Sequence, residues 1–124
     1  MSRTSPPSFA SMPMFRGPYS PVRAEIDLVD CEVEGRLPAD LAGTFYRVGP
    51  DFQYPPKLPN IPFDGEGHVG MFRFANGHVD YRSRYVRTRR FEAQAAAREA
   101  LFGTYRNPYP DDPRVAGVSR GSSV

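Results

Sequence analysis

The sequence predicts a mostly β-fold with one short helix, and three features of the chain support this prediction. It contains 14 Pro and 11 Gly among 124 residues, a share that is above average and excludes a helical bundle. An Asn76-Gly77 pair lies between two runs of strand-forming residues, which is a strong signal for a β-hairpin. Several alanines are concentrated in residues 93–100, where they favour a helix.

Length and composition exclude several classes of protein. A chain of 124 residues forms one domain at most, and its net charge of +2 is too balanced to indicate nucleic-acid binding. The single cysteine, Cys31, excludes a disulfide framework, and its neighbours Asp30 and Glu32 argue against a reactive thiol. No apolar run approaches the roughly 20 residues of a membrane span. The N-terminus lacks the layout of a secretory signal, so we expect a cytoplasmic location.

The N-terminal part of the chain is expected to hold a tail, a strand and a turn. Residues 1–22 are rich in proline and have no periodic apolar pattern, which predicts a polyproline-like or disordered tail before one domain over residues 23–124. Apolar residues among acidic ones predict a strand over Glu25–Val33. Leu37–Leu41, with a proline near its start, predicts a short helical turn.

The next segments predict a second strand and a hairpin. Thr44–Val48 is the second strand, closed by Gly49-Pro50, and Phe52–Pro62 is a proline-rich loop. In the hairpin, residues whose numbers sum to 153 face each other because the Asn76-Gly77 loop has two residues. Three cross-strand pairs follow: Phe74–Val79, Phe72–Tyr81 and Arg73–Asp80. This pattern predicts one buried and one partly solvated face.

One helix is expected to follow the hairpin. Thr88 is suited to be its N-cap, and the alanine-rich run extends the helix over Arg89–Phe102, with Gly103 at its C-terminal end. Residues 105–113 are rich in turn-forming types.

Two groups of residues could carry chemistry. Asp64, Glu66 and His68 alternate, so on a strand they would share one face and could hold a divalent metal. We favour a glycine-rich turn that enters a strand, with His68 bonded to a neighbour, and we expect His78 beside the hairpin turn to be exposed. The second group is an arginine cluster interleaved with aromatic residues: Arg82, Arg84, Arg87, Arg89 and Arg90. Such a patch could bind nucleic acid, but we favour a solvated surface paired with the acids of residues 25–34.

Two long segments resemble motifs of a known family, the carotenoid cleavage oxygenases. Residues 35–50, GRLPADLAGTFYRVGP, and residues 63–74, FDGEGHVGMFRF, are similar to successive motifs of these enzymes. Residues 82–88 and 100–108 point to the lignostilbene dioxygenase branch. The resemblance covers nearly all of the chain beyond the predicted tail.

The resemblance implies a seven-bladed β-propeller with a helical cap, of which this chain would form the incomplete N-terminal portion. It also implies a non-haem Fe(II) held by four histidines, and cleavage by O₂ of the central alkene of a lignostilbene, hydroxystilbene or carotenoid-like substrate to two aldehydes. By this likeness Phe63 would stack on the substrate ring. Tyr105 would be a catalytic and substrate-binding residue that hydrogen-bonds the 4-hydroxyl. The family lysine that shares this task falls beyond residue 124, and Lys57 does not match it.

The chain departs from the family pattern at its C-terminal end. The family continues as a strand after residue 121, and its four iron-binding histidines fall later, so His68 and His78 match none of them. We therefore assign no metal ligand here and expect this chain alone to be inactive and to bind no Fe(II) tightly. The complete enzyme would take a phenolic stilbene-like substrate and O₂, without nucleic acid or a membrane span, and a homodimer is left open.

Two other interpretations of the chain stay open at this point. It could be a small stand-alone binding module, which holds an anionic partner with the Arg/Tyr patch or a small ligand with its aromatic face, or it could be a remnant without a function of its own. Salt-dependent binding to single-stranded nucleic acid would favour the module.

Overall fold

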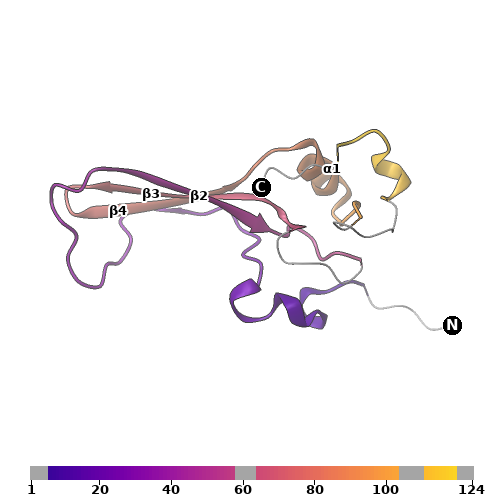
Figure 1. Cartoon of the computed structure of the whole chain (residues 1–124), viewed down its shortest axis with the longest axis horizontal. Coiled ribbons are helices and arrows are strands. Elements are labelled where there is room, and N and C mark those ends of the chain that lie inside the picture. Colours follow the sequence, from indigo (N-terminus) through magenta and orange to yellow (C-terminus); the bar gives the residue numbers. More distant parts are fainter. Residues whose placement is uncertain (1–5, 58–63, 104–110, 120–124) are drawn as a thin grey trace.

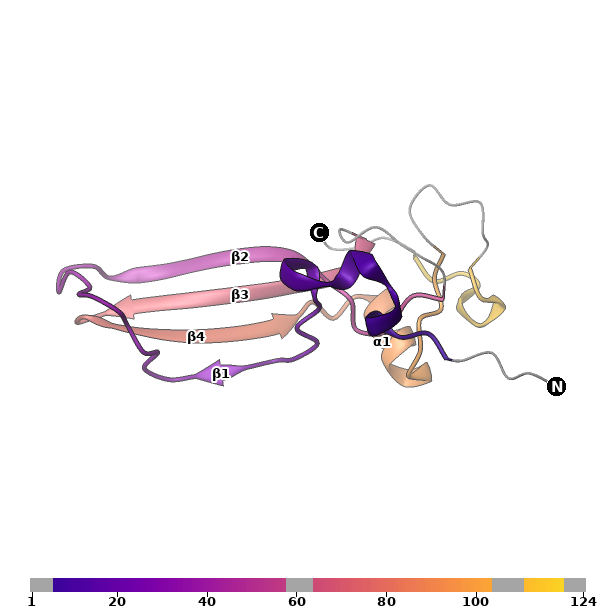
Figure 2. The ribbon, with the colours of Figure 1, turned by 90° about the horizontal axis from the view of Figure 1, so that it is seen from below.

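A computed structural model of the chain describes residues 6–57, 64–103 and 111–119. Its centre is a four-stranded antiparallel sheet in the order β1-β4-β3-β2, which Figure 1 shows nearly edge-on and Figure 2 shows with all four strands labelled. The strands are β1 (Asp27–Leu28), β2 (Gly43–Asp51), β3 (Glu66–Ala75) and β4 (His78–Tyr85), and helix α1 (Arg89–Ala97) lies beyond one end of the sheet. The expected mostly β-fold with a short helix is confirmed, and the described residues form one sheet rather than a visible propeller.

Strands β3 and β4 form the predicted hairpin in the predicted register. Asn76 and Gly77 have φ angles of 52° and 78°, in the left-handed region that a type I′ turn requires. The three predicted pairs are all present: Phe74–Val79, Phe72–Tyr81 and Arg73–Asp80. The register was predictable because a two-residue loop determines it locally.

Strand β1 is much shorter than the strand expected over Glu25–Val33. Asp30 interrupts it with a φ of 62°, and the Asp30 N–H donates to Oδ1 of Asp80 over 2.7 Å. The Cys31 N–H then donates to the Val79 carbonyl over 2.7 Å. The segment therefore stays beside β4 on both sides of the interruption, although only Asp27–Leu28 forms a regular strand.

The next two elements also differ from the prediction. The Leu41 N–H donates to the Pro38 carbonyl over 3.2 Å, which closes a simple turn where a helical turn was expected. Strand β2 extends beyond the predicted Thr44–Val48 at both ends and includes Pro50. Proline is tolerated there because β2 is an edge strand, so its missing N–H need not cost a ladder hydrogen bond.

Helix α1 begins where expected but ends earlier than predicted. Thr88 accepts a hydrogen bond from the Phe91 N–H over 3.0 Å, which confirms it as the N-cap. Arg98 adopts a left-handed conformation with φ of 58°, so the helix ends at Ala97 and does not reach Phe102. Within residues 6–57, 64–103 and 111–119, no helix has the length and apolarity needed to cross a bilayer.

The described part of the predicted tail is folded. It forms three short 3₁₀-helices, Phe9–Ser11, Pro13–Phe15 and Gly17–Tyr19, which lie against one end of the sheet (Figure 2). Phe15 is buried, and its ring contacts Phe9 at 5.2 Å and Phe52 at 4.9 Å between centroids. A polyproline-like or disordered conformation is therefore wrong for these residues, because Phe52 supplies an apolar partner that is distant in sequence. The domain boundary at residue 22 stays a prediction.

Edge strand β2 has exposed apolar side chains on both faces. Phe45 is 57% exposed on one face, and Tyr46 and Val48 are 65% and 51% exposed on the other. On the face that carries Phe45, Val79 of β4 is buried as predicted. The expected buried face is thus covered only in part within the described residues.

Candidate functional site

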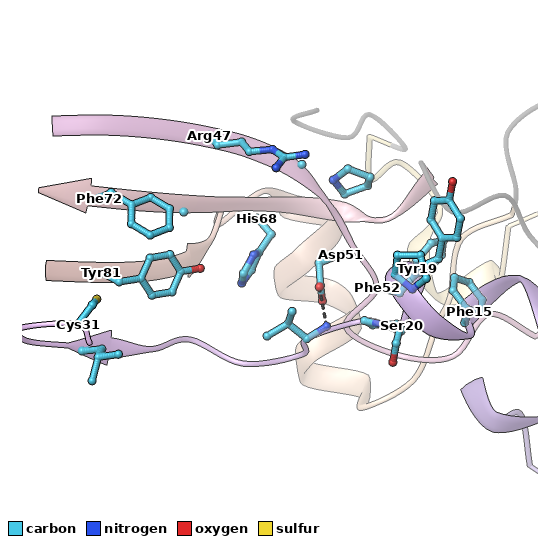
Figure 3. Close-up of a pocket in the computed structure, with 17 residues that line it drawn as sticks. Phe15, Tyr19, Ser20, Cys31, Arg47, Asp51, Phe52, His68, Phe72 and Tyr81 are labelled. Carbon is cyan, nitrogen blue, oxygen red and sulfur yellow. Dashed lines mark hydrogen bonds between the residues drawn. The ribbon is translucent and has the colours of Figure 1, made fainter. Parts of the chain in front are cut away.

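A pocket of about 930 Å³ lies between the folded N-terminal segment and one face of the sheet (Figure 3). The sheet contributes Arg47, His68, Phe72 and Tyr81, and the N-terminal segment contributes aromatic side chains that include Tyr19. The rings of Phe72 and Tyr81 contact each other with centroids 4.8 Å apart. A mainly apolar pocket with a few polar groups is typical of small-molecule sites.

Asp51, at the end of β2, joins the N-terminal segment to the sheet. Its carboxylate accepts hydrogen bonds from the backbone N–H groups of Val22 at 2.8 Å and Arg23 at 3.0 Å. The hydroxyl of Tyr85 donates to the same carboxylate over 2.6 Å. The buried charge of Asp51 is therefore compensated by three donors, and the role of this residue is to hold the pocket wall in place.

His68 lines the pocket, but its Nε2 atom already makes a hydrogen bond within the chain. Nε2 lies 2.9 Å from the Ala24 carbonyl, which only accepts hydrogen bonds, so Nε2 carries a hydrogen and donates it. The ring also packs edge-on against Tyr85 with centroids 4.8 Å apart. The prediction that His68 bonds a neighbour is confirmed.

The alternating acid, acid and histidine of β3 do not converge on a metal site. Glu66 is buried and bonds Arg90, whereas His68 bonds Ala24. His78 lies at the turn end of the hairpin, is exposed, and donates from Nδ1 to Asp30 over 2.8 Å. The part of the chain that the structure describes contains no group of three His, Cys, Asp or Glu side chains suited to a metal ion. These residues do not fit the iron that the family resemblance implies.

A buried polar network lies where α1 meets the start of β3. Oε1 of Glu66 accepts from Nε of Arg90 at 2.8 Å and from Nε2 of Gln94 at 2.6 Å. Arg90 also donates from Nη2 to the Asp64 carbonyl over 3.1 Å. The other end of the Gln94 amide accepts the N–H of Leu101 over 2.9 Å. This network connects the segment before β3 with the segment after α1.

The two residues expected to contact substrate, Phe63 and Tyr105, lie outside the described residues. Residues close to them in the sequence are described. Asp64 directly follows Phe63 and bonds Arg90, and the Gly103 N–H, two positions before Tyr105, donates to Oδ1 of Asp111 over 2.6 Å. The roles of Phe63 and Tyr105 stay predictions.

Most of the arginine cluster is paired with carboxylates. Arg82 and Arg84 donate to the two oxygens of Asp27 at 2.6 and 2.7 Å, and Arg87 donates to Glu25 at 2.8 Å. Both acids lie within residues 25–34, as the favoured interpretation requires. Arg90 is buried against Glu66. The surface is accordingly not a concentrated positive patch of the kind that binds phosphates.

The sequence did not single out Asp51 or Gln94, and it placed Arg90 in the arginine cluster rather than in a buried network. Each is buried and bonds a side chain far away in sequence: Asp51 with Tyr85, and Arg90 and Gln94 with Glu66. No local pattern marks such residues, since their partners are determined by tertiary packing.

Comparison with known proteins relates the chain to a family of oxygenases. The model of the RPE65, or retinal pigment epithelial membrane protein, family matches residues 19–123. Lignostilbene-α,β-dioxygenase isozyme III of Sphingomonas paucimobilis is 46% identical over 86% of this chain and 22% of its own length. An isoeugenol monooxygenase of Pseudomonas nitroreducens is 47% identical over 87% of this chain and 23% of its own length.

A solved structure shares the fold of the chain. The crystal structure of Pseudomonas brassicacearum lignostilbene dioxygenase matches with a TM-score of 0.80 and 46% identity, over 90% of this chain and 23% of that chain. The chain therefore spans about a fifth of the length of the relatives that it matches.

Proposed function

Because the chain belongs to the RPE65 family of carotenoid cleavage oxygenases, we propose that it forms part of a non-haem Fe(II) dioxygenase acting on phenolic stilbenes. The reaction is insertion of O₂ across the central alkene of a lignostilbene or hydroxystilbene, which yields two aldehydes. The observation that carries the proposal is the similarity to lignostilbene dioxygenases over most of the chain, in sequence and in fold.

The proposal assigns the iron to residues outside this chain. The sequence has two histidines, and both already make hydrogen bonds, to Ala24 and to Asp30. A non-haem Fe(II) would supply the activation of O₂ when bound. The contribution of this chain is to bind and orient the phenolic end of the substrate.

Phe63 and Tyr105 are the residues proposed for this task. Phe63 offers an aromatic face on which the substrate ring stacks, and the Tyr105 hydroxyl holds the 4-hydroxyl by a hydrogen bond. When the Tyr105 oxygen accepts a hydrogen bond from the 4-hydroxyl, electron density shifts from the hydroxyl oxygen through the ring into the conjugated alkene, which makes the alkene more reactive toward oxygen without a proton leaving the substrate. The isoeugenol relative is consistent with this requirement, because isoeugenol is also a phenol conjugated to an alkene.

The test uses a fusion enzyme, in which this chain replaces the matching segment of Pseudomonas brassicacearum lignostilbene dioxygenase. We expect the fusion enzyme to convert a 4-hydroxystilbene under ¹⁸O₂ to two aldehydes, with ¹⁸O incorporated into the products. The negative control is the fusion enzyme in which a scrambled version of this chain occupies the same segment. A soluble, iron-loaded fusion enzyme that leaves 4-hydroxystilbenes intact would contradict the proposal.

Cytoplasmic location and a homodimeric complete enzyme stay predictions.

The alternative of a stand-alone binding module is not favoured, because Arg82, Arg84 and Arg87 are neutralised by carboxylates in the described structure.

A further inference from the structure

The pocket between the N-terminal segment and the sheet contains two hydrogen-bond donors that the fold does not use. Arg47 of β2 and Tyr81 of β4 both line it (Figure 3). Among the residues that the structure describes, the Arg47 guanidinium has no carboxylate partner and the Tyr81 hydroxyl makes no hydrogen bond. By contrast, Arg82, Arg84 and Arg87 are all paired with acids. Unused donors in the wall of a mainly apolar pocket are the groups that orient a bound ligand.

The strand register places these two donors on either side of Gly70. Gly70 of β3 is the cross-strand partner of Arg47. The Tyr81 ring leans over Gly70 from β4, because a Cβ on this glycine would lie 3.4 Å from both the ring and the hydroxyl oxygen of Tyr81. Phe72, two residues along β3, packs against the same ring. A flat acceptor group that rests on Gly70 would therefore lie between the Arg47 side chain and the Tyr81 hydroxyl.

A second glycine keeps the floor of the pocket open next to the donors. Gly49 lies two residues beyond Arg47 on the same face of β2, and it also lines the pocket. A Cβ on Gly49 would meet no atom within 4 Å, so the space above it is empty in the described part of the chain. The N-terminal segment adds the ring of Tyr19, which is 63% exposed, to the pocket wall. An aromatic ring thus has room above Gly49 and aromatic neighbours to pack against.

The charges of the pocket favour a ligand with a single negative charge. Arg47 is the only Lys or Arg among the described residues that line it, and the carboxylate of Asp51 is already compensated by three donors. Four positions of extended strand, about 13 Å, separate Asp51 from Arg47, so an anion at Arg47 stays clear of that carboxylate. A carboxylate suits one guanidinium because it accepts two parallel hydrogen bonds from it. A phosphate dianion would lack a second cation here.

We propose that this pocket binds an aromatic monocarboxylate. Its carboxylate accepts hydrogen bonds from the Arg47 guanidinium and the Tyr81 hydroxyl above Gly70, and its ring lies over Gly49. This binding site goes beyond the proposed function, since it uses neither the iron nor the residues proposed to hold the phenolic end of a stilbene. A fusion enzyme that fails to cleave stilbenes would therefore leave the following measurements valid.

The first test measures the affinity of the fusion enzyme for 3-phenylpropanoate, which has neither an alkene nor a phenolic hydroxyl, by isothermal titration calorimetry. Arg47→Met should weaken binding about tenfold or more, and Tyr81→Phe about fivefold, since a charged and a neutral hydrogen-bonding group are lost. The neutral 3-phenylpropanamide should bind the parent no better than 3-phenylpropanoate binds Arg47→Met. Equal affinity of the parent and Arg47→Met, or no binding by a folded parent, would overturn the proposal.

Arg36→Met is the matched control for the lost charge. Arg36 is also an exposed arginine without an ion pair among the described residues, but it does not line the pocket. The variant should leave the affinity for 3-phenylpropanoate unchanged. A loss as large as that of Arg47→Met would show that only the net charge of the protein attracts the acid, and it would contradict a specific site.

A second test locates the ligand and checks its class. Gly49→Val fills the open floor without meeting other atoms, so it should abolish binding while thermal unfolding stays the same. Bibenzyl and 4-hydroxybibenzyl, which lack the alkene and are not cleaved, should not displace 3-phenylpropanoate. Displacement would place the acid in the substrate site and refute the proposal. Hexanoate should bind about fivefold more weakly, and equal binding of hexanoate would refute the assignment of an aromatic ligand.

Discussion

Tyr85 of β4 donates its hydroxyl hydrogen to Oδ1 of Asp51 in β2, over 2.6 Å and across the intervening strand β3. Burial, followed by this hydrogen bond, raises the pKa of Tyr85 above its ordinary value, so the phenol stays a neutral donor. The same carboxylate accepts the N–H groups of Val22 and Arg23. One buried residue therefore connects the sheet with the folded N-terminal segment.

Replacing this phenol should loosen the N-terminal segment. Tyr85→Phe leaves a buried carboxylate oxygen with one donor fewer, which should lower the free energy of unfolding of the fusion enzyme by about 1–2 kcal/mol. Urea unfolding measures the change. Tyr81→Phe is the matched control, because the Tyr81 hydroxyl makes no hydrogen bond within the described residues, and equal effects of the two variants would contradict the assignment.

The ion pair of Glu25 should make stability depend on pH. The hydrogen bond from Arg87 is the main reason that the pKa of Glu25 lies below 4.5; burial opposes it, and the Tyr85 N–H adds to it. A carboxyl group whose pKa is lower in the folded state than in the unfolded state stabilises the fold at pH values above its unfolded pKa. This contribution is lost as the pH falls through the folded-state pKa. Glu25→Gln should therefore be less stable than the parent at pH 7, on the order of 0.5 kcal/mol.

This difference should shrink as the pH is lowered below 4.5, and thermal unfolding of the fusion enzyme between pH 3 and pH 7 measures it. Glu34→Gln, at an exposed glutamate without an ion pair among the described residues, controls for the loss of a surface charge. A difference that persists unchanged to pH 3 would show that the carboxylate is not responsible.

Iron content should not depend on the histidines of this chain. The variant His68→Asn with His78→Asn should keep the iron stoichiometry of the fusion enzyme, because the two rings bond Ala24 and Asp30 near opposite ends of the hairpin. The 124-residue chain by itself should not bind stoichiometric Fe(II) or cleave stilbenes. Metal analysis by mass spectrometry measures the iron content of the double variant and of the isolated chain. Iron lost from the double variant would place a ligand in this chain.

Tyr105 should matter only for substrates with a free 4-hydroxyl. Tyr105→Phe in the fusion enzyme should lower kcat/KM for a 4-hydroxystilbene by about tenfold or more, since one hydrogen bond to the hydroxyl is lost. The dissociation constant of bibenzyl should stay the same. Phe102→Leu, at a neighbouring aromatic residue, is the comparison, and a similar loss of hydroxyl selectivity there would argue against a specific role for Tyr105.

The isolated chain should self-associate. Edge strand β2 exposes Phe45, Tyr46 and Val48 beside backbone groups that have no strand partner among the described residues, which is a template for pairing with another chain. Size-exclusion chromatography with light scattering should detect oligomers, and Val48→Lys should reduce them. The control Val29→Lys changes the same apolar residue type at an exposed position outside the regular strands, and it should not reduce the oligomers. A parent chain that is monodisperse and unfolds in one sharp transition would refute this prediction.

The elements that the sequence predicted well are those formed by local interactions. The hairpin register followed from Asn76-Gly77, and the start of α1 followed from Thr88. The elements predicted poorly depend on distant partners. Strand β1 is interrupted where Asp30 bonds Asp80, and the N-terminal segment folds because Phe15 contacts Phe52.

The sequence alone determined the family, the hairpin and the identity of the residues proposed to bind substrate, because motifs and turn types are properties of short segments. Only the tertiary structure decided which polar residues are buried together. Glu66 is joined to Arg90 and Gln94, and Asp51 to Tyr85, across more than twenty positions of chain. Burial makes such partners obligatory, since a polar group removed from water must find a hydrogen bond elsewhere in the fold.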